Sequence, residues 1–263
     1  MTERLRHCIE GYREQTRHVA RPDFTAQTLD RCGLADRYAI IDSAIGPVYV
    51  AWNPRGVSAV RQADDAEAFE RWFRRRFSRR AMPVQDEPEI LDLVRRALRG
   101  EKVELEIDLR DCTHFEAAVL RKAREIPRGH ARPYAWVARE IGNPRAVRAV
   151  GSALANNPVP LLIPCHRVVR SDYGCGEYVF GKPKKYELLT GEGLHMSEIQ
   201  ELARHGIRYI VQTEYNCFCL PTCGADLMAE LNEHEHEHLK LHSVDEALGM
   251  GLKPCGVCRP IAA

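Results

Sequence analysis

The chain lacks long apolar runs. No window of about 18 uninterrupted apolar residues occurs, and a membrane-spanning helix needs a stretch of that length. The N-terminal stretch MTERLRHCIEGYREQ also lacks the apolar core of a secretory signal peptide, because charged residues interrupt it. At 263 residues, 44% of them hydrophobic, the chain is long enough for two domains or more. We therefore expect a soluble, cytoplasmic protein that does not act on a membrane.

The sequence gives no support for a disulfide framework, although it holds ten cysteines. Without a sign of secretion, thiols in such numbers indicate reduced side chains, metal ligands or catalysis. Four of them form two close pairs near the C-terminus, Cys219 with Cys223 and Cys255 with Cys258. Four others are interpreted as ordinary thiols: Cys8, Cys32, Cys112 and Cys175.

Net charge is nearly absent as well, at +1, but the average hides a segregation along the chain. Residues 120–170 carry ten Lys and Arg against two Glu, a balance of +8. Residues 215–263 carry three Lys and Arg against seven Asp and Glu, a balance of −4. The basic middle predicts a polyanionic partner, and the acidic C-terminal part does not.

Two segments near the start of the patterned sequence predict mixed α/β structure. Residues 38–52 have the pattern of two strands around a Gly-Pro turn, which is typical of a hairpin. Residues 65–80 predict a helix with an aromatic stripe formed by Phe69, Phe73 and Phe77. We expect this stripe to face a core rather than to stack on bases.

Further elements follow with helical and alternating patterns. A second helix is expected at 90–100, where a glycine ends it, and a strand at 103–108, where VELEID alternates. Beyond this point the pattern turns helical, beginning with residues 114–126.

A pair of short helices is predicted at 133–142 and 143–155, with Asn143 as cap and a proline as first residue of the second helix. Two short helices at this spacing are typical of a helix-turn-helix. The second helix would carry Arg145 and Arg148. Because the pair lies in the basic middle of the chain, we interpret it as a DNA-binding element.

The stretch IPCHRVVR sets Cys165 beside a histidine and an arginine. Taken alone, a cysteine after the apolar run PLLI is more often a buried and inert thiol. The longer stretch RAVGSALANNPVPLLIPCHRVVR, residues 148–170, resembles the active-site signature of the O6-alkylguanine-DNA alkyltransferases, the methylated-DNA–protein-cysteine methyltransferases. The resemblance extends over residues 38–193, and Pro-Cys-His-Arg-Val is very specific to that family.

The resemblance implies a fold of several parts. An α/β domain of the ribonuclease-H-like type is expected at 37–110, after a polar N-terminal extension at 1–36. An α-rich, winged-helix-like domain with the helix-turn-helix is expected at 111–195 and would carry Cys165. A small zinc-binding domain would follow at 196–263.

The same resemblance implies direct DNA repair, in which an alkyl group moves irreversibly from O6 of guanine, or O4 of thymine, to Cys165. Displacement at carbon requires a thiolate, a base for the thiol and stabilisation of the departing guanine. By family analogy His166 takes the thiol proton through a water, Glu192 orients the imidazole, and Asn157 ties together the turn that holds the site. No second thiol is identified that would remove the alkyl group, so each chain is expected to act once.

DNA contacts are implied for Tyr134, Arg145, Arg148 and Arg167. The target atom is buried in a base pair, so the nucleotide must be flipped out of the duplex. The Tyr134 hydroxyl would donate to the purine ring, and Arg148 would fill the vacancy. In this family the recognition helix enters the minor groove, which predicts double-stranded alkylated DNA as partner, with little sequence readout. In a bacterial source the protein would associate with the nucleoid.

The predicted wall of the substrate pocket departs from the family pattern. Tyr178, Val179, Phe180 and Gly181 lie where many members have Tyr-Arg-Trp-Gly or Tyr-Ser-Gly-Gly. The tyrosine and the glycine are kept, and the two middle residues differ. The size of the preferred alkyl group is therefore left open.

The spacings Cys219-x3-Cys223 and Cys255-x2-Cys258 match the arrangement of a tetrahedral zinc site. A segment of about 50 residues is stabilised by a metal in place of a large core. With the stretch EALGMGLKPCGVCRP, the pattern resembles the zinc domain of the bacterial adaptive-response protein Ada. Unrelated buried thiols are the alternative, and Cys217 could compete with Cys219 as a ligand.

The role of this zinc segment is less specific. In Ada the first of the four cysteines also accepts methyl groups from DNA phosphotriesters, but here Leu220, Gly256 and Val257 replace the cations of that motif. Four thiolates around zinc carry a net negative charge, and approach to a phosphate backbone without nearby cations is unfavourable. We therefore expect a structural zinc module that binds a protein partner or positions the catalytic domain.

The stretch NEHEHEHLKLH, within residues 232–242, alternates His234, His236 and His238 with glutamates. It has the composition of either an accessory metal site or a solvated polar loop, and we favour the loop.

Two other functions compete with repair. A methyl-responsive DNA-binding regulator is disfavoured by the acidic zinc module and by the lack of a second helix-turn-helix. A non-catalytic protein that recognises alkylguanine is disfavoured because relatives of that type replace the cysteine that stands here at 165.

Overall fold

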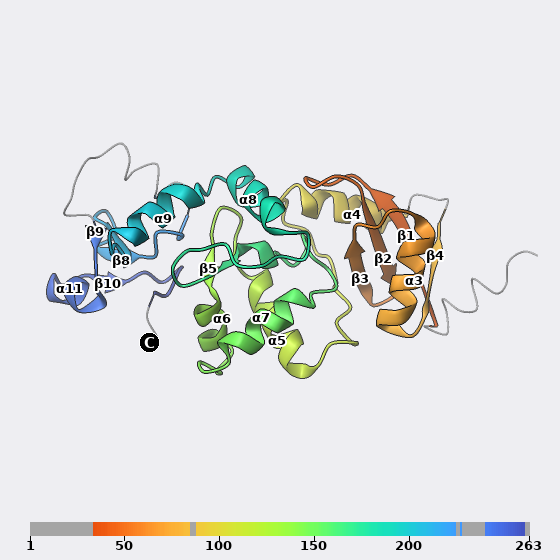
Figure 1. Ribbon diagram of the computed structural model, residues 1–263, viewed down its shortest axis with the longest axis horizontal. Coiled ribbons are helices and arrows are strands. Elements are labelled where there is room, and N and C mark those ends of the chain that lie inside the picture. The colour runs from red at the N-terminus through yellow and green to blue at the C-terminus, as the bar shows by residue number, and fades with distance from the viewer. Residues whose placement is uncertain (1–33, 85–87, 225–226, 228–239, 261–263) are drawn as a thin grey trace, which may run out of the picture.

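The computed structural model describes residues 34–84, 88–224, 227 and 240–260 (Figure 1). Most of the predicted N-terminal extension lies outside these ranges, and so do His234, His236 and His238. Among the described helices, none has both the length and the apolar character needed to cross a membrane.

The N-terminal part is a four-stranded mixed sheet with the strand order β3-β2-β1-β4. Strands β1, β2 and β3 pair antiparallel in sequence, and β4 pairs parallel to β1. The predicted hairpin at 38–52 is confirmed by the β1–β2 pair. The elements of this part are β1 (Ala35–Ile41), β2 (Val48–Asn53), β3 (Gly56–Arg61), α3 (Ala66–Phe77), β4 (Arg80–Pro83) and α4 (Glu89–Leu98).

Both faces of this sheet are covered. Alternate residues of a strand point to opposite faces, and β2 places Tyr49 and Ala51 against the aromatic stripe of α3. On the other face of β2, Val48, Val50 and Trp52 belong to the main core with α4 and α5 (His114–Arg124). The predicted core-facing role of the α3 stripe is therefore confirmed, since Phe69, Phe73 and Phe77 are all buried.

The predicted strand at 103–108 is wrong. Only Ile107 forms a bridge, to Val57 at the start of β3. The amide of Val57 donates to the Glu106 carbonyl over 2.9 Å, and the amide of Asp108 donates back to Val57 over 2.8 Å. Farther along β3, the amide of Val60 donates to the carbonyl of Pro158 instead. The edge of β3 is therefore bonded to a different segment there, and residues 103–108 do not form a continuous ladder with it.

A helical part follows the sheet and contains the segment that resembles an active site. The pair α6 and α7 has the predicted order, but α7 begins at Val147, later than expected. The side chain of Asn143 donates to the Ile141 carbonyl over 3.0 Å, so it closes the preceding helix instead of capping the next. The elements are α5, β5 (Arg132–Pro133), α6 (Tyr134–Glu140), α7 (Val147–Ala155), the 3-10 helix η1 (Cys165–Arg167), β6 (Val168–Val169) and α8 (Lys182–Gly191).

The C-terminal part is a small second sheet of order β10-β8-β7-β9, at the opposite end of the molecule from the first sheet (Figure 1). It packs on the helical part through one apolar cluster, which joins Val169 and Leu189 to Met196, Ile199 and the cysteines of the two pairs. The elements are α9 (Met196–Arg204), β7 (Tyr209–Gln212), β8 (Cys217–Cys219), β9 (Lys240–Leu241), α11 (Val244–Gly249) and β10 (Lys253–Pro254).

Candidate active site

Cys165 is the first residue of η1 and is only 4% exposed. Its sulfur accepts a hydrogen bond from Asn157 Nδ2 over 3.1 Å. The same nitrogen donates to the carbonyl of Ile163 over 3.1 Å, and Asn157 Oδ1 accepts from the amide of Val159 over 3.0 Å. One buried side chain therefore closes the turn before the cysteine and also contacts its sulfur.

The carboxylate of Glu192 binds the two residues that follow Cys165, His166 and Arg167. Its Oε1 lies 3.1 Å from His166 Nε2 and accepts from Arg167 Nη2 over 2.7 Å. Its Oε2 accepts from Arg167 Nε over 2.8 Å. Burial by itself raises the pKa of Glu192, but the hydrogen bonds from His166 and Arg167 outweigh it and bring the pKa to about 2. Glu192 is therefore ionised at neutral pH.

The ionised Glu192 fixes the tautomer of His166. A carboxylate without a proton can only accept, so Nε2 of the imidazole carries the hydrogen. Burial lowers the pKa of His166, although Glu192 acts to raise it, and the ring is therefore neutral. Its Nδ1 then has a free lone pair, and this atom is buried without a hydrogen-bond partner. The imidazole can accept one proton at Nδ1.

The thiol of Cys165 also rests in its neutral form. Burial raises its pKa, while the hydrogen bond from Asn157 and the charge of Lys185 act in the opposite direction. Neutral thiol and neutral imidazole mean that a thiolate forms only when a proton leaves for His166, which protects the site from reaction with other electrophiles.

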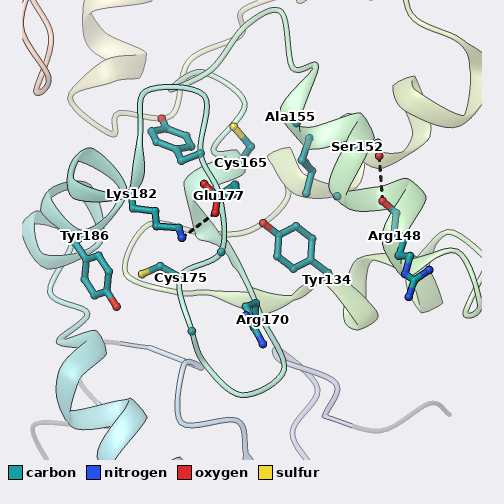
Figure 2. A pocket seen from close by; sticks show the side chains of 15 residues that line it. Tyr134, Arg148, Ser152, Ala155, Cys165, Arg170, Cys175, Glu177, Lys182 and Tyr186 are labelled. Carbon is teal, nitrogen blue, oxygen red and sulfur yellow. Dashed lines mark hydrogen bonds and ion pairs between the residues drawn. The ribbon is translucent and has the colours of Figure 1, made fainter.

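Cys165 lines a cavity of about 740 Å³ (Figure 2). Tyr134, the first residue of α6, lies on the opposite wall with its hydroxyl directed into the cavity. A Cβ added at Gly176 would lie 3.0 Å from this hydroxyl, so glycine permits the loop to approach the phenol. Burial raises the pKa of Tyr134 to about 12, so its hydroxyl is a neutral donor.

Lys185 is a member of the site that the sequence analysis missed. It is fully buried and donates from Nζ to the carbonyl of Val168 over 2.6 Å. Burial lowers its pKa to about 8, because the charged ammonium is removed from water. Lys185 lies three residues before Leu188 on α8, and a lysine on the apolar face of a helix is the signal that would have indicated it.

Two of the three predicted pocket residues lie elsewhere. Tyr178 lines the cavity, whereas Val179 and Phe180 do not. Val179 is 37% exposed at the surface. The ring of Phe180 packs edge to face against that of Tyr178 at 5.6 Å and joins the main core. Their place in the cavity is taken by Cys175, Glu177 and other residues of the preceding loop.

The arginines predicted to contact DNA separate into two groups. Arg148, in the first turn of α7, lines the rim of the cavity, with its guanidinium directed away from Cys165 (Figure 2). Arg145 is exposed in the turn before α7. Arg167 faces inward and binds Glu192 and the Ile126 carbonyl, the latter over 2.7 Å from Nη1. The prediction of a DNA contact is therefore corrected for Arg167.

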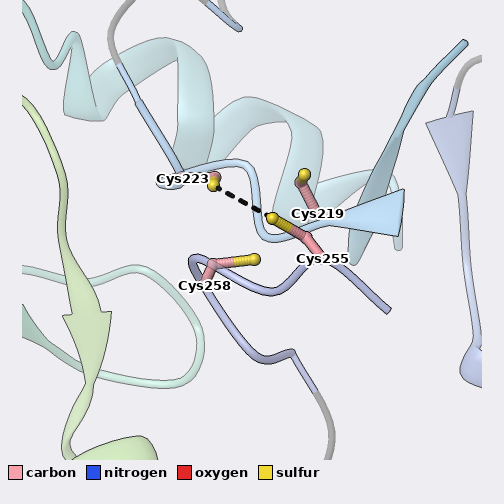
Figure 3. A group of neighbouring side chains, drawn as sticks. All are labelled: Cys219, Cys223, Cys255 and Cys258. Atoms are coloured by element: carbon pink, nitrogen blue, oxygen red, sulfur yellow. Dashed lines mark hydrogen bonds between the residues drawn. The ribbon is translucent and has the colours of Figure 1, made fainter. Parts of the chain in front are cut away.

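The four predicted metal ligands come together from two segments, the end of β8 with the loop after it and the loop after β10 (Figure 3). We call these segments, residues 219–223 and 255–258, the two cysteine loops. Their sulfur atoms all lie within 4.8 Å of one another, and all four side chains are buried. The Sγ atoms of Cys223 and Cys255 are 3.9 Å apart, close to the roughly 3.8 Å between two thiolate sulfurs on a tetrahedral zinc. The donor set therefore fits a zinc ion. Cys217 lies outside this group, with its sulfur 3.8 Å from Gln212 Oε1.

Comparison with known proteins gives a consistent family. A family model described as the DNA-binding domain of 6-O-methylguanine DNA methyltransferase matches residues 114–194. The methylated-DNA–protein-cysteine methyltransferase of Methanothermobacter thermautotrophicus is 33% identical over 150 residues, which cover 56% of this chain and 80% of that protein. The protein of the same name from Methanosarcina acetivorans is 32% identical over 163 residues, which cover 59% and 97%.

A longer relative and a solved structure add to this. The bifunctional transcriptional activator/DNA repair enzyme Ada of Escherichia coli is 35% identical over 165 residues, 60% of this chain, but the match spans only 46% of Ada. A crystal structure of an OGT variant from Mycobacterium tuberculosis has a TM-score of 0.50 at 31% identity, covering 60% of this chain and 92% of that one. The matched family model falls on the part of the chain that holds the cavity.

Proposed function

Because the chain belongs to the family of methylated-DNA–protein-cysteine methyltransferases, which repair O6-alkylguanine directly, we propose that Cys165 is the residue that takes up the alkyl group. The observation that carries this proposal is a buried cysteine on the wall of a 740 Å³ cavity, followed in sequence by a neutral imidazole with one unpartnered nitrogen. A cysteine that served only for packing would need neither the cavity nor the adjacent imidazole.

The thiol proton leaves first. It passes through a water to Nδ1 of His166, and the imidazolium that forms is stabilised by Glu192. The charge of Lys185 and the Asn157 hydrogen bond stabilise the thiolate as it forms. The sulfur then attacks the alkyl carbon, and the bond from this carbon to O6 breaks as the carbon–sulfur bond forms.

The departing guanine takes the electron pair of the broken bond. Tyr134, whose hydroxyl is a neutral donor directed into the cavity, hydrogen-bonds the purine ring and reduces the charge that builds on it. Guanine finally gains one proton, which balances the proton lost by the thiol. The thioether on Cys165 is stable, so the chain acts once.

Double-stranded DNA with an alkylated guanine is the proposed partner. Residues 114–194 match a DNA-binding model and contain the whole basic middle of the chain, residues 120–170. We place α7 in the minor groove, with Arg148 filling the vacancy that the flipped nucleotide leaves and Arg145 near a phosphate. O4-alkylthymine is a second substrate on the same chemistry, and the cytoplasm is the expected compartment.

We also propose a domain assignment for each of the three parts of the chain. The sheet with three antiparallel strands and one parallel strand suits a ribonuclease-H-like domain at 37–110. The α6–α7 pair suits a winged-helix-like domain at 111–195. The second sheet with its four cysteines suits an Ada-like module at 196–263.

We propose a structural zinc ion at Cys219, Cys223, Cys255 and Cys258. Zinc would hold the two loops together and leave no open coordination position for catalysis. Elemental analysis of the purified protein should give one zinc per chain, and Cys219→Ser should reduce it. Cys112→Ser, which changes a thiol outside the cluster, should not. Equal zinc in both variants would contradict this site.

Repair by methyl transfer from phosphotriesters to Cys219 is disfavoured, since all four thiols are buried and the segment is acidic. Mass spectrometry of Cys165→Ala after incubation with a methyl phosphotriester oligonucleotide should find no methyl at Cys219. A methyl there would reopen the regulator hypothesis, which also requires that methylation change promoter binding.

The decisive experiment is intact mass measurement and peptide mapping after incubation with an oligonucleotide that carries O6-methylguanine. We expect a gain of one methyl group at Cys165, and none in Cys165→Ser. Tight binding without a methyl gain would support the non-catalytic recogniser and contradict the proposed transfer.

A further inference from the structure

The loops that carry the four cysteines also bind the segment that carries Tyr134. Ala131 and Thr222 exchange two hydrogen bonds: the Ala131 amide donates to the Thr222 carbonyl over 2.9 Å, and the Thr222 hydroxyl donates to the Ala131 carbonyl over 2.8 Å. Arg132, only 1% exposed, donates from Nη1 to the same Thr222 carbonyl over 3.1 Å. Because Thr222 directly precedes Cys223, the first cysteine loop is fastened to strand β5.

The second cysteine loop is fastened to helix α6 by Trp136. The indole Nε1 donates to the carbonyl of Cys258 over 2.8 Å, and the ring is 4% exposed. The guanidinium of Arg259 lies 5.3 Å from the centre of this ring and pairs with Glu140 over 2.7 Å. Arg139 donates to the carbonyl of Arg259 over 2.7 Å. The loop therefore holds both the middle and the end of α6.

The residues that make these contacts are close in the fold to Tyr134 and Cys165. Tyr134 lies two residues before Trp136 on α6. On its other side, β5 pairs in parallel with β6, which directly follows η1 and its Cys165. The segment 131–140 is thus held between the cysteine loops and the strand that leaves the nucleophile. A shift of the loops would move Tyr134 relative to Cys165.

We propose that Trp136 is a positioning residue that couples the four-cysteine site to Tyr134, so that metal at that site sets the rate of alkyl transfer. The inference rests on the proposed zinc site and on the proposed transfer to Cys165. Bound zinc would hold the two loops in one arrangement, and the hydrogen bonds of Thr222 and Trp136 would then keep β5 and α6 in place relative to them. The module is then part of the repair machinery, although none of its residues that the structure describes lines the cavity.

The matched variants are Trp136→Phe and Trp72→Phe. The first keeps a ring but removes the N–H that binds the Cys258 carbonyl. The second makes the same chemical change in the N-terminal part, on α3, where Trp72 packs against Phe69, Phe73 and Phe77. Each is compared with the unchanged protein, both as isolated and after zinc has been removed by a strong chelator under reducing conditions and then restored.

Three quantities are measured for each sample. Elemental analysis gives zinc per chain. Hydrogen exchange gives the protection of the amides in residues 131–142. Single-turnover kinetics give the rate constant of methyl transfer at saturating DNA and, separately, with free O6-alkylguanine base, which does not require DNA binding.

Both transfer rate constants should fall roughly 10- to 100-fold in Trp136→Phe and in the zinc-free protein, because a misplaced Tyr134 no longer meets the purine. Amide protection over residues 131–142 should fall in the same samples, and zinc should restore both properties in the unchanged protein. Trp72→Phe should keep normal zinc and normal rates. A role limited to stability would lower the melting temperature of Trp136→Phe without changing the rate constants of the folded protein.

The outcomes separate this inference from the proposals beneath it. Stoichiometric zinc with unchanged rates and protection after its removal would overturn the coupling and leave the zinc site intact. Slow transfer by Trp136→Phe in a protein that never holds zinc would overturn the metal dependence and keep Trp136 as a positioning residue. No methyl on Cys165 in any sample would instead contradict the proposed transfer itself.

Discussion

The side chain of Asn157 donates a hydrogen bond to the sulfur of Cys165 over 3.1 Å. Asn157 lies eight residues before the cysteine and is 5% exposed, so water does not compete for this contact. The hydrogen bond opposes the rise in pKa that burial imposes on the thiol. One amide therefore serves the shape of the turn and the reactivity of the sulfur.

Replacement of Asn157 by Ala should lower both stability and reaction rate. The loss leaves buried groups of the turn unpaired, which should lower the free energy of unfolding by about 1–3 kcal/mol. The thiol pKa should rise further, so methyl transfer at neutral pH should slow. Denaturant unfolding and single-turnover kinetics measure the two effects. Asn156→Ala, at the exposed neighbouring position, is the control, and equal rates in the two variants would contradict the role of the sulfur contact.

Glu192→Gln should change the acid stability of the protein. The folded pKa of about 2 lies below the ordinary value of 4.5, so the folded state binds fewer protons between these values. The stabilisation is complete above pH 4.5 and is lost as the pH falls toward 2, by about 3 kcal/mol at 1.36 kcal/mol per pKa unit. Unfolding measured from pH 2 to 6 should show this loss in the unchanged protein and a reduced loss in the variant.

The same Glu192→Gln variant should transfer methyl groups more slowly, because a neutral amide stabilises the imidazolium of His166 less well than a carboxylate. A decrease of roughly 100-fold is expected from the size of general-base effects. Glu187→Gln, which changes a carboxylate that pairs with Lys184 near the surface, is the control. If Glu192→Gln kept the full rate at pH 7, His166 would not be the proton acceptor.

Lys185→Met should lower the rate of methyl transfer and alter its pH dependence. Protonated Lys185 attracts the Cys165 thiolate, and its pKa of about 8 means that this attraction fades above pH 8. The rate constant of the unchanged protein should therefore decline above that pH, and the variant should be at least about tenfold slower below it, without a decline. Lys184→Met, whose amine pairs with Glu187 near the surface and which does not line the cavity, should keep the profile of the unchanged protein.

The stability of Lys185→Met provides a second check. Because the folded pKa lies below the ordinary value of 10.5, the folded protein binds fewer protons between pH 8 and 10.5. The free energy of unfolding should therefore rise with pH over this window in the unchanged protein, relative to the variant. Parallel curves for the two proteins would show that Lys185 is not held at a lowered pKa.

Arg148→Ala should impair repair of DNA but not reaction with a free base. The side chain is exposed at the rim of the cavity and takes no part in the contacts of Cys165. Loss of the group that fills the vacated stack should lower transfer from double-stranded DNA roughly 10- to 100-fold, because extrusion of the nucleotide becomes more costly. Transfer from free O6-alkylguanine should stay within about twofold. Arg121→Ala, an exposed arginine of α5, is the control, and equal loss in both variants would indicate only a general charge effect.

Local signals in the sequence predicted much of this molecule. The period of Phe69, Phe73 and Phe77 predicted a buried helical face, and paired spacings predicted the four-cysteine group. Each of these signals is a spacing of three or four residues, so each can be recognised within one short stretch of sequence. The resemblance around Cys165 added the neighbours that the structure brings into contact, His166 with Glu192 and Asn157 with Cys165.

The features that the sequence analysis missed depend on contacts between residues distant in sequence. The alternation at 103–108 predicts a strand, but the edge of β3 offers it a partner only at Val57. Arg167 was expected at DNA from the resemblance, but the internal carboxylate of Glu192, 25 residues later, binds it instead. Lys185 donates to the carbonyl of Val168, and Trp136 donates to the carbonyl of Cys258. Composition does not indicate such acceptors, because they lie far from the donors in sequence.

The shared apolar cluster between the catalytic and cysteine-bearing parts has a consequence for anyone who wishes to shorten this protein. A version that stopped before α9 would uncover Val169 and Leu189, and it would remove the carbonyl that Trp136 needs. Exposed apolar patches of this kind promote aggregation. A minimal repair unit should therefore be sought by trimming the N-terminal extension, while the turn that carries Cys258 and Arg259 is kept.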